Sequence, residues 1–104
     1  MVLIRSATFH FKEGRRNEAI SELELILNKE VRTTKGFQGY ISMLSKDTET
    51  RAVIITLWGD ELSFNTSGTL LLAPAMKKIS DTLENEPHFE TFKLSSTEMY
   101  LGAR

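Results

Sequence analysis

Residues 35–61, KGFQGYISMLSKDTETRAVIITLWGDE, decide the fold of this chain. Two glycines flank Phe37, an alternating run follows, and the polar segment SKDTET separates it from a second run. That second run is rich in β-branched residues and extends from Arg51 to Trp58. Two such runs joined by a short polar loop predict an antiparallel hairpin. Gly39 within the first run indicates a β-bulge, or a position that another backbone or a ligand approaches closely.

A strand and a helix are predicted before this hairpin. Residues 2–11 alternate loosely and are rich in β-branched and aromatic side chains, as in a strand. Apolar residues occur on both faces of this strand, so we expect it to be covered on both sides. From Arg15 to Val31 the apolar residues recur at helical spacing, and Gly36 then terminates the helix.

A second helix and a last strand are predicted after the hairpin. The segment WGDELSFNTSG is expected to form a short helical turn and a loop. A helical stripe follows over residues 69–85. Pro74 places the start of its regular part near residues 71–73, because proline is tolerated only in the first turn. Pro87 ends the helix, and residues 88–100 have the pattern of a final strand.

The element order β-α-β-β-α-β predicts an α+β, ferredoxin-like fold with a four-stranded antiparallel sheet. Right-handed crossovers place the first and third strands in the centre of the sheet and both helices on one face. The other face carries Ile, Val, Phe and Met side chains, and an apolar sheet face in water is an interaction site. We therefore expect a homodimer packed sheet against sheet, which makes a dimeric α/β barrel.

The composition limits the class of protein. At 104 residues the chain is expected to form a single domain, residues 1–104. A formal net charge of −1 argues against nucleic-acid binding, and the absence of cysteine excludes disulfides, thiolate metal sites and cysteine nucleophiles. The N-terminal residues lack the apolar core of a signal peptide, and no apolar run is long enough to span a bilayer. We expect a soluble, cytoplasmic protein with no nucleic-acid or membrane partner.

The residues of the hairpin also resemble a known family. GFQGY after a helix, a hairpin, and VIITLWGDE before a helical segment resemble the antibiotic biosynthesis monooxygenase family, in the dimeric α+β barrel superfamily. The element order is shared over nearly the whole chain, and the specific positions are Gly36, Phe37, Gly39 and Trp58. The resemblance implies a dimer of ferredoxin-like subunits, each with a small apolar pocket between sheet and helices. The family includes cofactor-free oxygenases of aromatic polyketides and quinol-like molecules, and also haem-degrading enzymes.

Six residues are candidates for lining such a pocket: Trp58, Arg5, Thr56, Phe9, Phe64 and Met76. Trp58 fits either a pocket wall that stacks on a flat ligand or a core position with its N–H satisfied. Arg5 shares a strand face with Ala7, where it would offset the charge of a phenolate, or it reaches solvent at the strand end. Met76 lies at helical spacing and also fits the core.

The haem-degrading branch of the family is not expected, because its iron-site residues are absent. That branch uses an Asn on the first strand, where this chain has Ala7, and a His on the second helix, where LLLAPAMKKISDTL has none. We therefore expect no cofactor. The first and last strands should be neighbours, which brings His10 near His88 and Glu90; this is an incomplete metal-ligand set or an exposed cross-strand pair. Three further polar residues fit a pocket or a structural role: Tyr40, Tyr100 and Asn65.

Two functions follow as expectations. The first is a cofactor-independent monooxygenase acting on a small aromatic or quinol-like molecule. An electron-rich phenol, once deprotonated, passes an electron to O₂, so the protein needs only to orient the molecule and stabilise its anion. The second is a non-catalytic small-molecule-binding or dimerisation module of the same fold, favoured by the shortage of a clear base. P-loop, dinucleotide and zinc motifs are absent from the sequence.

Overall fold

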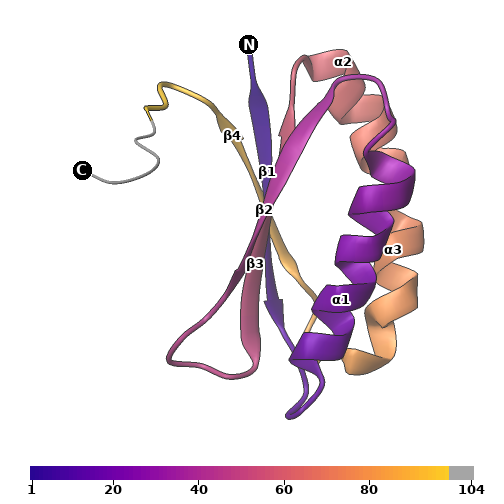
Figure 1. Ribbon diagram of the computed structural model, residues 1–104, viewed down its shortest axis with the longest axis vertical. Helices are drawn as coiled ribbons and strands as arrows, with labels where there is room; N and C mark the ends of the chain where they lie inside the picture. The colour runs from indigo at the N-terminus through magenta and orange to yellow at the C-terminus, as the bar shows by residue number, and fades with distance from the viewer. Residues whose placement is uncertain (99–104) are drawn as a thin grey trace.

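The computed structural model of the protein describes residues 1–98. It is a four-stranded antiparallel sheet with the helices packed on one face (Figure 1). The strands are β1 (Leu3–His10), β2 (Phe37–Leu44), β3 (Arg51–Trp58) and β4 (His88–Lys93). The helices are α1 (Arg16–Ile26), α2 (Glu61–Ser63) and α3 (Leu72–Ile79), with π-helical turns η1 (Leu27–Val31) and η2 (Phe64–Gly68) and the 3₁₀ turn η3 (Ser80–Thr82). The strand order β2-β3-β1-β4 confirms the predicted α+β, ferredoxin-like fold.

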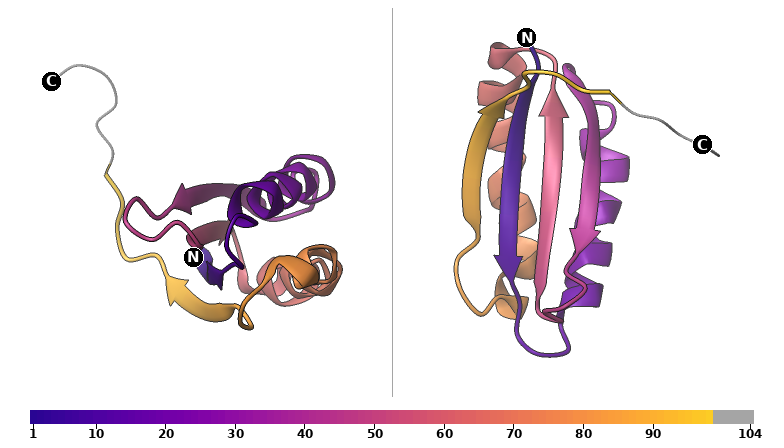
Figure 2. Two further views of the ribbon diagram at one scale, coloured as in Figure 1. Left: turned by 90° about the horizontal axis from the view of Figure 1, so that it is seen from below. Right: turned by 90° about the vertical axis from the view of Figure 1, so that its left-hand side faces the viewer.

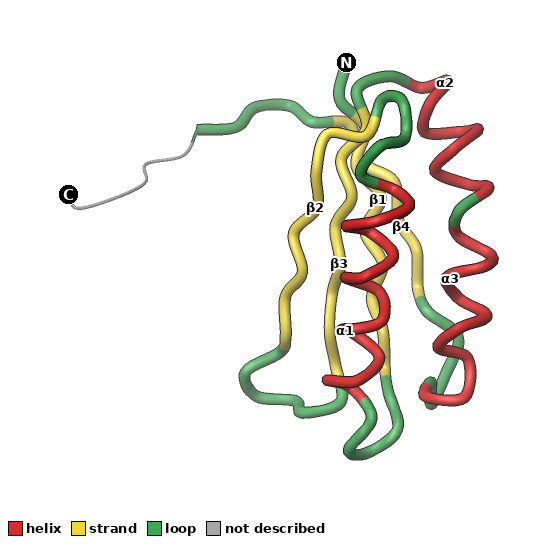
Figure 3. Tube along the Cα trace, turned by 45° about the vertical axis from the view of Figure 1, so that its right-hand side comes forward, coloured by secondary structure: helices red, strands yellow, loops and turns green. Residues whose placement is uncertain are grey.

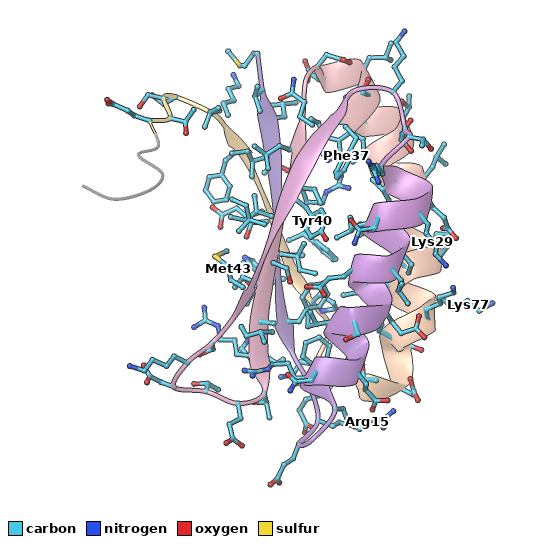
Figure 4. All side chains as sticks on the ribbon, viewed as in Figure 1. Arg15, Lys29, Phe37, Tyr40, Met43 and Lys77 are labelled. Atoms are coloured by element: carbon cyan, nitrogen blue, oxygen red, sulfur yellow. The ribbon has the colours of Figure 1, made fainter. Side chains whose placement is uncertain are left out.

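The predicted bulge at Gly39 is confirmed, and it changes which side chains of β2 face the helices. The register against β3 shifts between Phe37 and Gly39, where Gly39 has a φ of 146°. Strict alternation from Phe37 through Met43 in the sequence would place Phe37 on the face of Ile41 and Met43, and the structure shows otherwise. The extra residue turns Phe37 to the inner face, where it packs against the core together with Tyr40. Figure 4 shows Phe37 and Tyr40 pointing toward the helices and Met43 pointing away.

The helical segment after the hairpin begins earlier than predicted. Helical backbone runs from Glu61 through α2 and η2, and after a turn at Leu71 it continues as α3 (Figure 3). Asp60 starts it, because its carboxylate accepts hydrogen bonds from the Ser63 N–H (2.7 Å) and the Ser63 hydroxyl (3.0 Å). Pro74 is the third residue of α3, near the start as expected, and the helical backbone ends with η3 at Thr82 rather than at residue 85.

The last strand is shorter than predicted, because β1, the strand with which it pairs, begins at Leu3. β4 ends at Lys93, which pairs with Leu3, the first residue of β1. One further hydrogen bond, from the Leu94 N–H to the Val2 carbonyl (2.9 Å), closes the ladder. The predicted extension to Tyr100 therefore stops early, and Tyr100 itself lies outside the described residues.

The apolar core lies between the inner face of the sheet and the helices. β1 contributes Phe9, whose ring stacks on that of Phe11 with the centroids 5.6 Å apart. α1 buries the predicted stripe, and α3 closes the layer with Ile79. Burial of this one layer holds both helices on the same face of the sheet.

The opposite face of the sheet is apolar and carries no helix. Figure 2, in its right-hand view, shows the four strands in front of the helices. Ile41, Met43 and Phe92 on this face are 50%, 40% and 44% exposed. The centre of the face carries the half-buried side chains of Ile4 and Ile55. Apolar residues on both faces of the sheet are thus confirmed.

Two glycines join the start of β2 to the end of β3. The Gly59 N–H donates to the Gly36 carbonyl at 2.7 Å, and Gly36 has a φ of +85°, which an L side chain rarely adopts. A Cβ at Gly36 would also collide with the side chain of Ser63. Gly36 and Gly59 therefore allow α2 to pack directly against the start of β2.

We expect Gly36→Ala to destabilise the protein more than Gly14→Ala. Gly14 also has a positive φ (78°), but a Cβ there meets nothing within 4 Å. The control should lose about 1–2 kcal/mol for the left-handed backbone alone. Gly36→Ala should lose a further 1–3 kcal/mol or so for overpacking against Ser63. Urea unfolding measures both losses, and equal losses would contradict the close packing of Gly36.

Candidate functional site

A small, mostly apolar cavity lies inside the protein between the sheet and the helices, with a volume of about 80 Å³. Its floor is the inner face of β1 and β3, with lining side chains Arg5, Ala7, Phe9, Ile54, Thr56 and Trp58. One wall comes from α1 and η1, with Leu23, Ile26, Leu27 and Val31. The other wall comes from Gly68 and from Leu71, Leu72, Ala75 and Met76 around α3. These α3-side chains and Phe89 of β4 keep partial solvent exposure, so the cavity opens on that side.

Five of the six candidate pocket residues lie on the surface of this cavity: Trp58, Arg5, Thr56, Phe9 and Met76. Phe64 lies beneath the Arg5 guanidinium, whose carbon is 4.4 Å from the centroid of the Phe64 ring. The sequence analysis did not identify Gly68 or Phe89. Nothing in the sequence singles out Gly68, because its role depends on its backbone carbonyl and on its lack of a side chain.

Trp58 is 2% exposed and is held on several sides. Its ring meets Phe37 edge to face, with the centroids 5.3 Å apart. Its indole N–H donates to the Thr56 hydroxyl at 3.1 Å. A Cβ at Gly68 would lie 3.2 Å from two carbons of the indole, so the backbone of η2 packs closely against the ring. The indole therefore forms a fixed wall of the cavity.

Arg5 brings the guanidinium charge into this apolar environment. It lies directly across from Thr56 on β3, and its Nη1 donates to the Gly68 carbonyl at 2.7 Å. Its Nη2 donates to the Thr69 hydroxyl at 3.3 Å. Burial lowers the pKa of Arg5, because desolvation disfavours the charged form, but a guanidinium stays protonated at neutral pH. Within residues 1–98 no carboxylate forms an ion pair with Arg5.

The cavity has the groups to bind and orient an anion, but none of its described lining residues has an acid–base side chain that titrates near neutral pH. Among the described lining residues, polar side chains come from Arg5, Thr56 and Trp58. Thr56 accepts the indole hydrogen bond, so its own hydroxyl proton is left to donate. Two residues after the end of β3 at Trp58, the two hydrogen bonds from Ser63 lower the pKa of Asp60, which serves as a helix cap.

The two histidines do not meet as expected. His88 lies opposite Thr8, and Glu90 lies opposite Ser6, whereas His10 lies two residues beyond Thr8 and opposite Arg51. The offset arises because the β1–β4 ladder begins at Thr8. Over the described part of the chain, no group of three His, Cys, Asp or Glu side chains is placed to hold a metal ion.

Tyr40 and Asn65 lie away from the cavity, and Tyr100 lies outside the described residues. Tyr40 packs against the core, and its hydroxyl is 3.3 Å from the Asn28 side-chain oxygen. Asn65 is exposed on η2. Ala7, where haem degradation was expected to need an Asn, is a buried part of the cavity floor.

Residues 2–67 match the family model described as antibiotic biosynthesis monooxygenase. The chain belongs to this family. The matched segment contains the glycines, Phe37 and Trp58 that carried the resemblance, so the family expectation is confirmed. It ends one residue before Gly68, so the α3 wall of the cavity lies outside the match. No curated protein matches the chain significantly.

Several solved structures share the antibiotic biosynthesis monooxygenase fold seen here. NE2512, a protein of unknown function from Nitrosomonas europaea, is 16% identical, with a TM-score of 0.77 over 97% of this chain and 96% of that one. Rv0793 from Mycobacterium tuberculosis is 12% identical, with a TM-score of 0.77 over 95% and 100%. A variant of SnoaB, a cofactor-independent oxygenase from Streptomyces nogalater, is 14% identical, with a TM-score of 0.69 over 92% and 95%. At these identities the likeness shows the fold alone.

In residues 1–98, no helix is both long and apolar enough to cross a bilayer.

We expect Gly68→Ala to displace the indole of Trp58. Alanine favours the helix by about 1 kcal/mol, but forcing a methyl group against a packed ring costs roughly 1–3 kcal/mol. The net result should be a small loss of stability with a clear shift of the tryptophan emission maximum, which reports on Trp58 alone because the chain has one tryptophan. Asn65→Ala, on the exposed side of the same turn, is the control and should leave the emission unchanged. Unchanged emission in Gly68→Ala would contradict the close contact.

Proposed function

We propose that this protein is a cofactor-independent monooxygenase of a small, electron-rich aromatic molecule bound in the cavity beside Trp58. The observation that carries the proposal is the partly buried guanidinium of Arg5, in an apolar cavity of a monooxygenase-family fold, with no carboxylate partner among the described residues. The fold shared with SnoaB, a cofactor-independent oxygenase, supports it.

The chemistry needs no reductant, because the substrate supplies all the electrons. A phenol loses its proton to solvent, and the phenolate transfers an electron to O₂. The two radicals join at a ring carbon, and loss of water leaves a quinone carbonyl. One oxygen atom of O₂ becomes the new carbonyl oxygen on a ring carbon, and the other leaves as water. The phenol is oxidised by four electrons. The net reaction is phenol plus O₂ giving quinone plus water.

The residues of the cavity would act by position and charge. The Arg5 guanidinium favours the ionised form of a nearby phenol and stabilises the anion where the reaction needs it. Thr56 donates its free hydroxyl proton to the same oxygen. Trp58 and Phe9 hold the ring, and Phe64 and Met76 support the shape of the site. A fixed arrangement of this kind lowers the barrier by orientation as well as by electrostatics.

Oxygen uptake tests the proposal. With a panel of phenols and hydroquinones, the protein should consume O₂ above the rate of spontaneous oxidation, and ¹⁸O₂ should label the quinone. Arg5→Met should reduce the rate by about 10²-fold, the usual loss for one donor that stabilises a developing anion. Arg51→Met, at an exposed strand end, is the matched control and should keep the rate.

The result that would contradict oxygenation is an absence of uptake over the whole panel. Release of hydrogen peroxide without ¹⁸O in the product would also exclude a monooxygenase. Because Arg5→Met also removes the hydrogen bonds to Gly68 and Thr69, its unfolding midpoint is measured alongside. Thr56→Val, which keeps the side-chain shape, is a second variant in which the rate of oxygen uptake should fall.

A second function, a non-catalytic small-molecule-binding module, is favoured by one observation. No described lining side chain titrates near neutral pH, so the cavity has no general base of its own. Ligand binding detected by tryptophan quenching, with no oxygen uptake over the panel, would favour this alternative.

We also propose that the apolar sheet face binds a second copy of the chain, forming a dimeric α/β barrel. Ile41, Met43 and Phe92 are large apolar side chains with 40–50% exposure on one surface. A four-stranded face is of the size that a stable interface needs, about 800 Å² from each partner. A self-complementary face of this kind is what a two-fold dimer uses.

Sedimentation equilibrium should therefore give twice the 11.8 kDa mass of the chain at micromolar concentration. Replacing Ile41 and Met43 by Glu should give a folded monomer, because charges would be buried in the interface without partners. Leu70→Glu, at a residue that is 74% exposed on the helical side, is the control and should remain dimeric. A wild-type monomer would contradict this proposal.

A further inference from the structure

A row of four polar side chains crosses the inner face of the sheet. The backbone registers align Tyr40 of β2 with Thr56 of β3, and Thr56 with Arg5 of β1. On its other side Arg5 aligns with Thr91 of β4. The adjacent rows contain Trp58 beside Leu3, and Ile54 beside Ala7, with Lys93 and Ser42 at their ends. The central row is polar on all four strands, and Arg5 and Thr56 are its two members that line the cavity.

These two groups offer donors to the cavity, and Arg5 offers charge that the protein does not neutralise. A guanidinium has five N–H donors, and the hydrogen bonds to Gly68 and Thr69 use two of them. The neighbours of Arg5 on the adjoining elements are Thr56, Thr91, Phe64, Gly68 and Thr69, and none carries a charge. A half-buried cation with spare donors is the complement of a small anion.

The size of the cavity limits the ring system that it can hold. Apolar cavities of roughly 150 Å³ bind benzene, and this one has a volume of about 80 Å³. One six-membered ring is therefore the upper limit, and it enters only if the partly exposed Leu72 and Met76 move outward, of which Met76 has the more adaptable side chain. A fused tricycle would need the helices to separate from the sheet.

Resting on the function proposed above for this pocket, we infer that the ligand is a single-ring phenol and that it is bound as the phenolate. The phenolate oxygen accepts from the Arg5 guanidinium and the Thr56 hydroxyl. The ring lies against Trp58 and Phe9 in the apolar part of the cavity. Selection of the ionised form follows from the donors of the polar row, and selection of one ring follows from the volume.

The charge of Arg5 makes the sign of one measurement decisive. A purely apolar cavity would bind the neutral phenol better and would raise the pKa of the bound ligand. A cavity that contains the unneutralised guanidinium should bind the phenolate better and lower that pKa. A fall of one pKa unit corresponds to tenfold tighter binding of the ionised form.

4-Nitrophenol is a suitable probe, because it ionises near neutral pH, its phenolate is yellow, and its ring is too electron-poor for easy oxidation. Titrated with the wild-type protein at a series of pH values, it should show a lowered pKa and bind at least about tenfold more tightly as the phenolate. 4-Nitroanisole, which has nearly the same shape and cannot ionise, should bind at least tenfold more weakly. A hydroxyanthraquinone, an ionisable tricycle, should not displace the probe.

Variants assign the effect to the polar row. Arg5→Met should abolish the lowering of the probe pKa or reverse its sign, Arg5→Lys should restore part of it, and Thr56→Val should reduce it. Arg51→Met should bind like the wild type. If the Arg5 variants do not fold, the sign of the wild-type shift still decides between the two outcomes.

An unshifted or raised probe pKa, equal binding of 4-nitroanisole, or tight binding of the tricycle would each overturn the inference. None of these results depends on turnover, so they are separate from the oxygen-uptake test. Phenolate-selective binding without oxygen uptake would leave the inference standing and defeat the oxygenase proposal. Oxygen uptake without phenolate selectivity would overturn the inference and leave the oxygenase proposal standing.

Discussion

Trp58 faces inward because its neighbours on three elements accommodate it, and the cavity depends on this placement. Thr56 satisfies the indole N–H from the same strand, Phe37 meets the ring edge to face, and Gly68 leaves room for it. A buried N–H without a partner would be costly, so the hydrogen bond within β3 lets the ring remain inside without help from a ligand. The bulge at Gly39 is part of the same arrangement, since it turns Phe37 toward the indole.

The protein's contribution to any reaction in this cavity is electrostatic and positional. The floor of the cavity is mostly apolar, and Arg5 and Thr56 add a guanidinium and a hydroxyl to it from paired positions on neighbouring strands. Within the described lining, the absence of a titratable base means that the bound molecule must supply the reactive group itself. A small domain can host oxygen chemistry under this condition, because the electrons come from the substrate.

Local patterns predicted most of the fold, and the errors come from effects that are not local. The hairpin, its bulge and the inward Trp58 follow from alternation, turn residues and Gly39. The end of β4 at Lys93 is set by where β1 begins, which the pattern of β4 does not contain. A short helical turn was predicted after Trp58, but its continuation to Gly68 was predicted as a loop because Thr66, Ser67 and Gly68 weaken helix propensity. The cap at Asp60 and close packing on Trp58 stabilise the helical backbone. The apolar stripes of the helices predicted which side chains point inward, but the empty space between them depends on distances that a stripe does not specify.

The two π-helical turns, η1 and η2, both border the cavity: Leu27 and Val31 come from the first and Gly68 from the second. A π turn accommodates one residue more than an α turn, and one residue corresponds to about 100° around a helix axis. Loss of a single residue from either stretch would restore regular pitch and rotate one end of the wall relative to the other. Relatives of this protein can therefore acquire a differently shaped chamber through a one-codon insertion or deletion within a helix, a kind of change that most folds accept only in their loops.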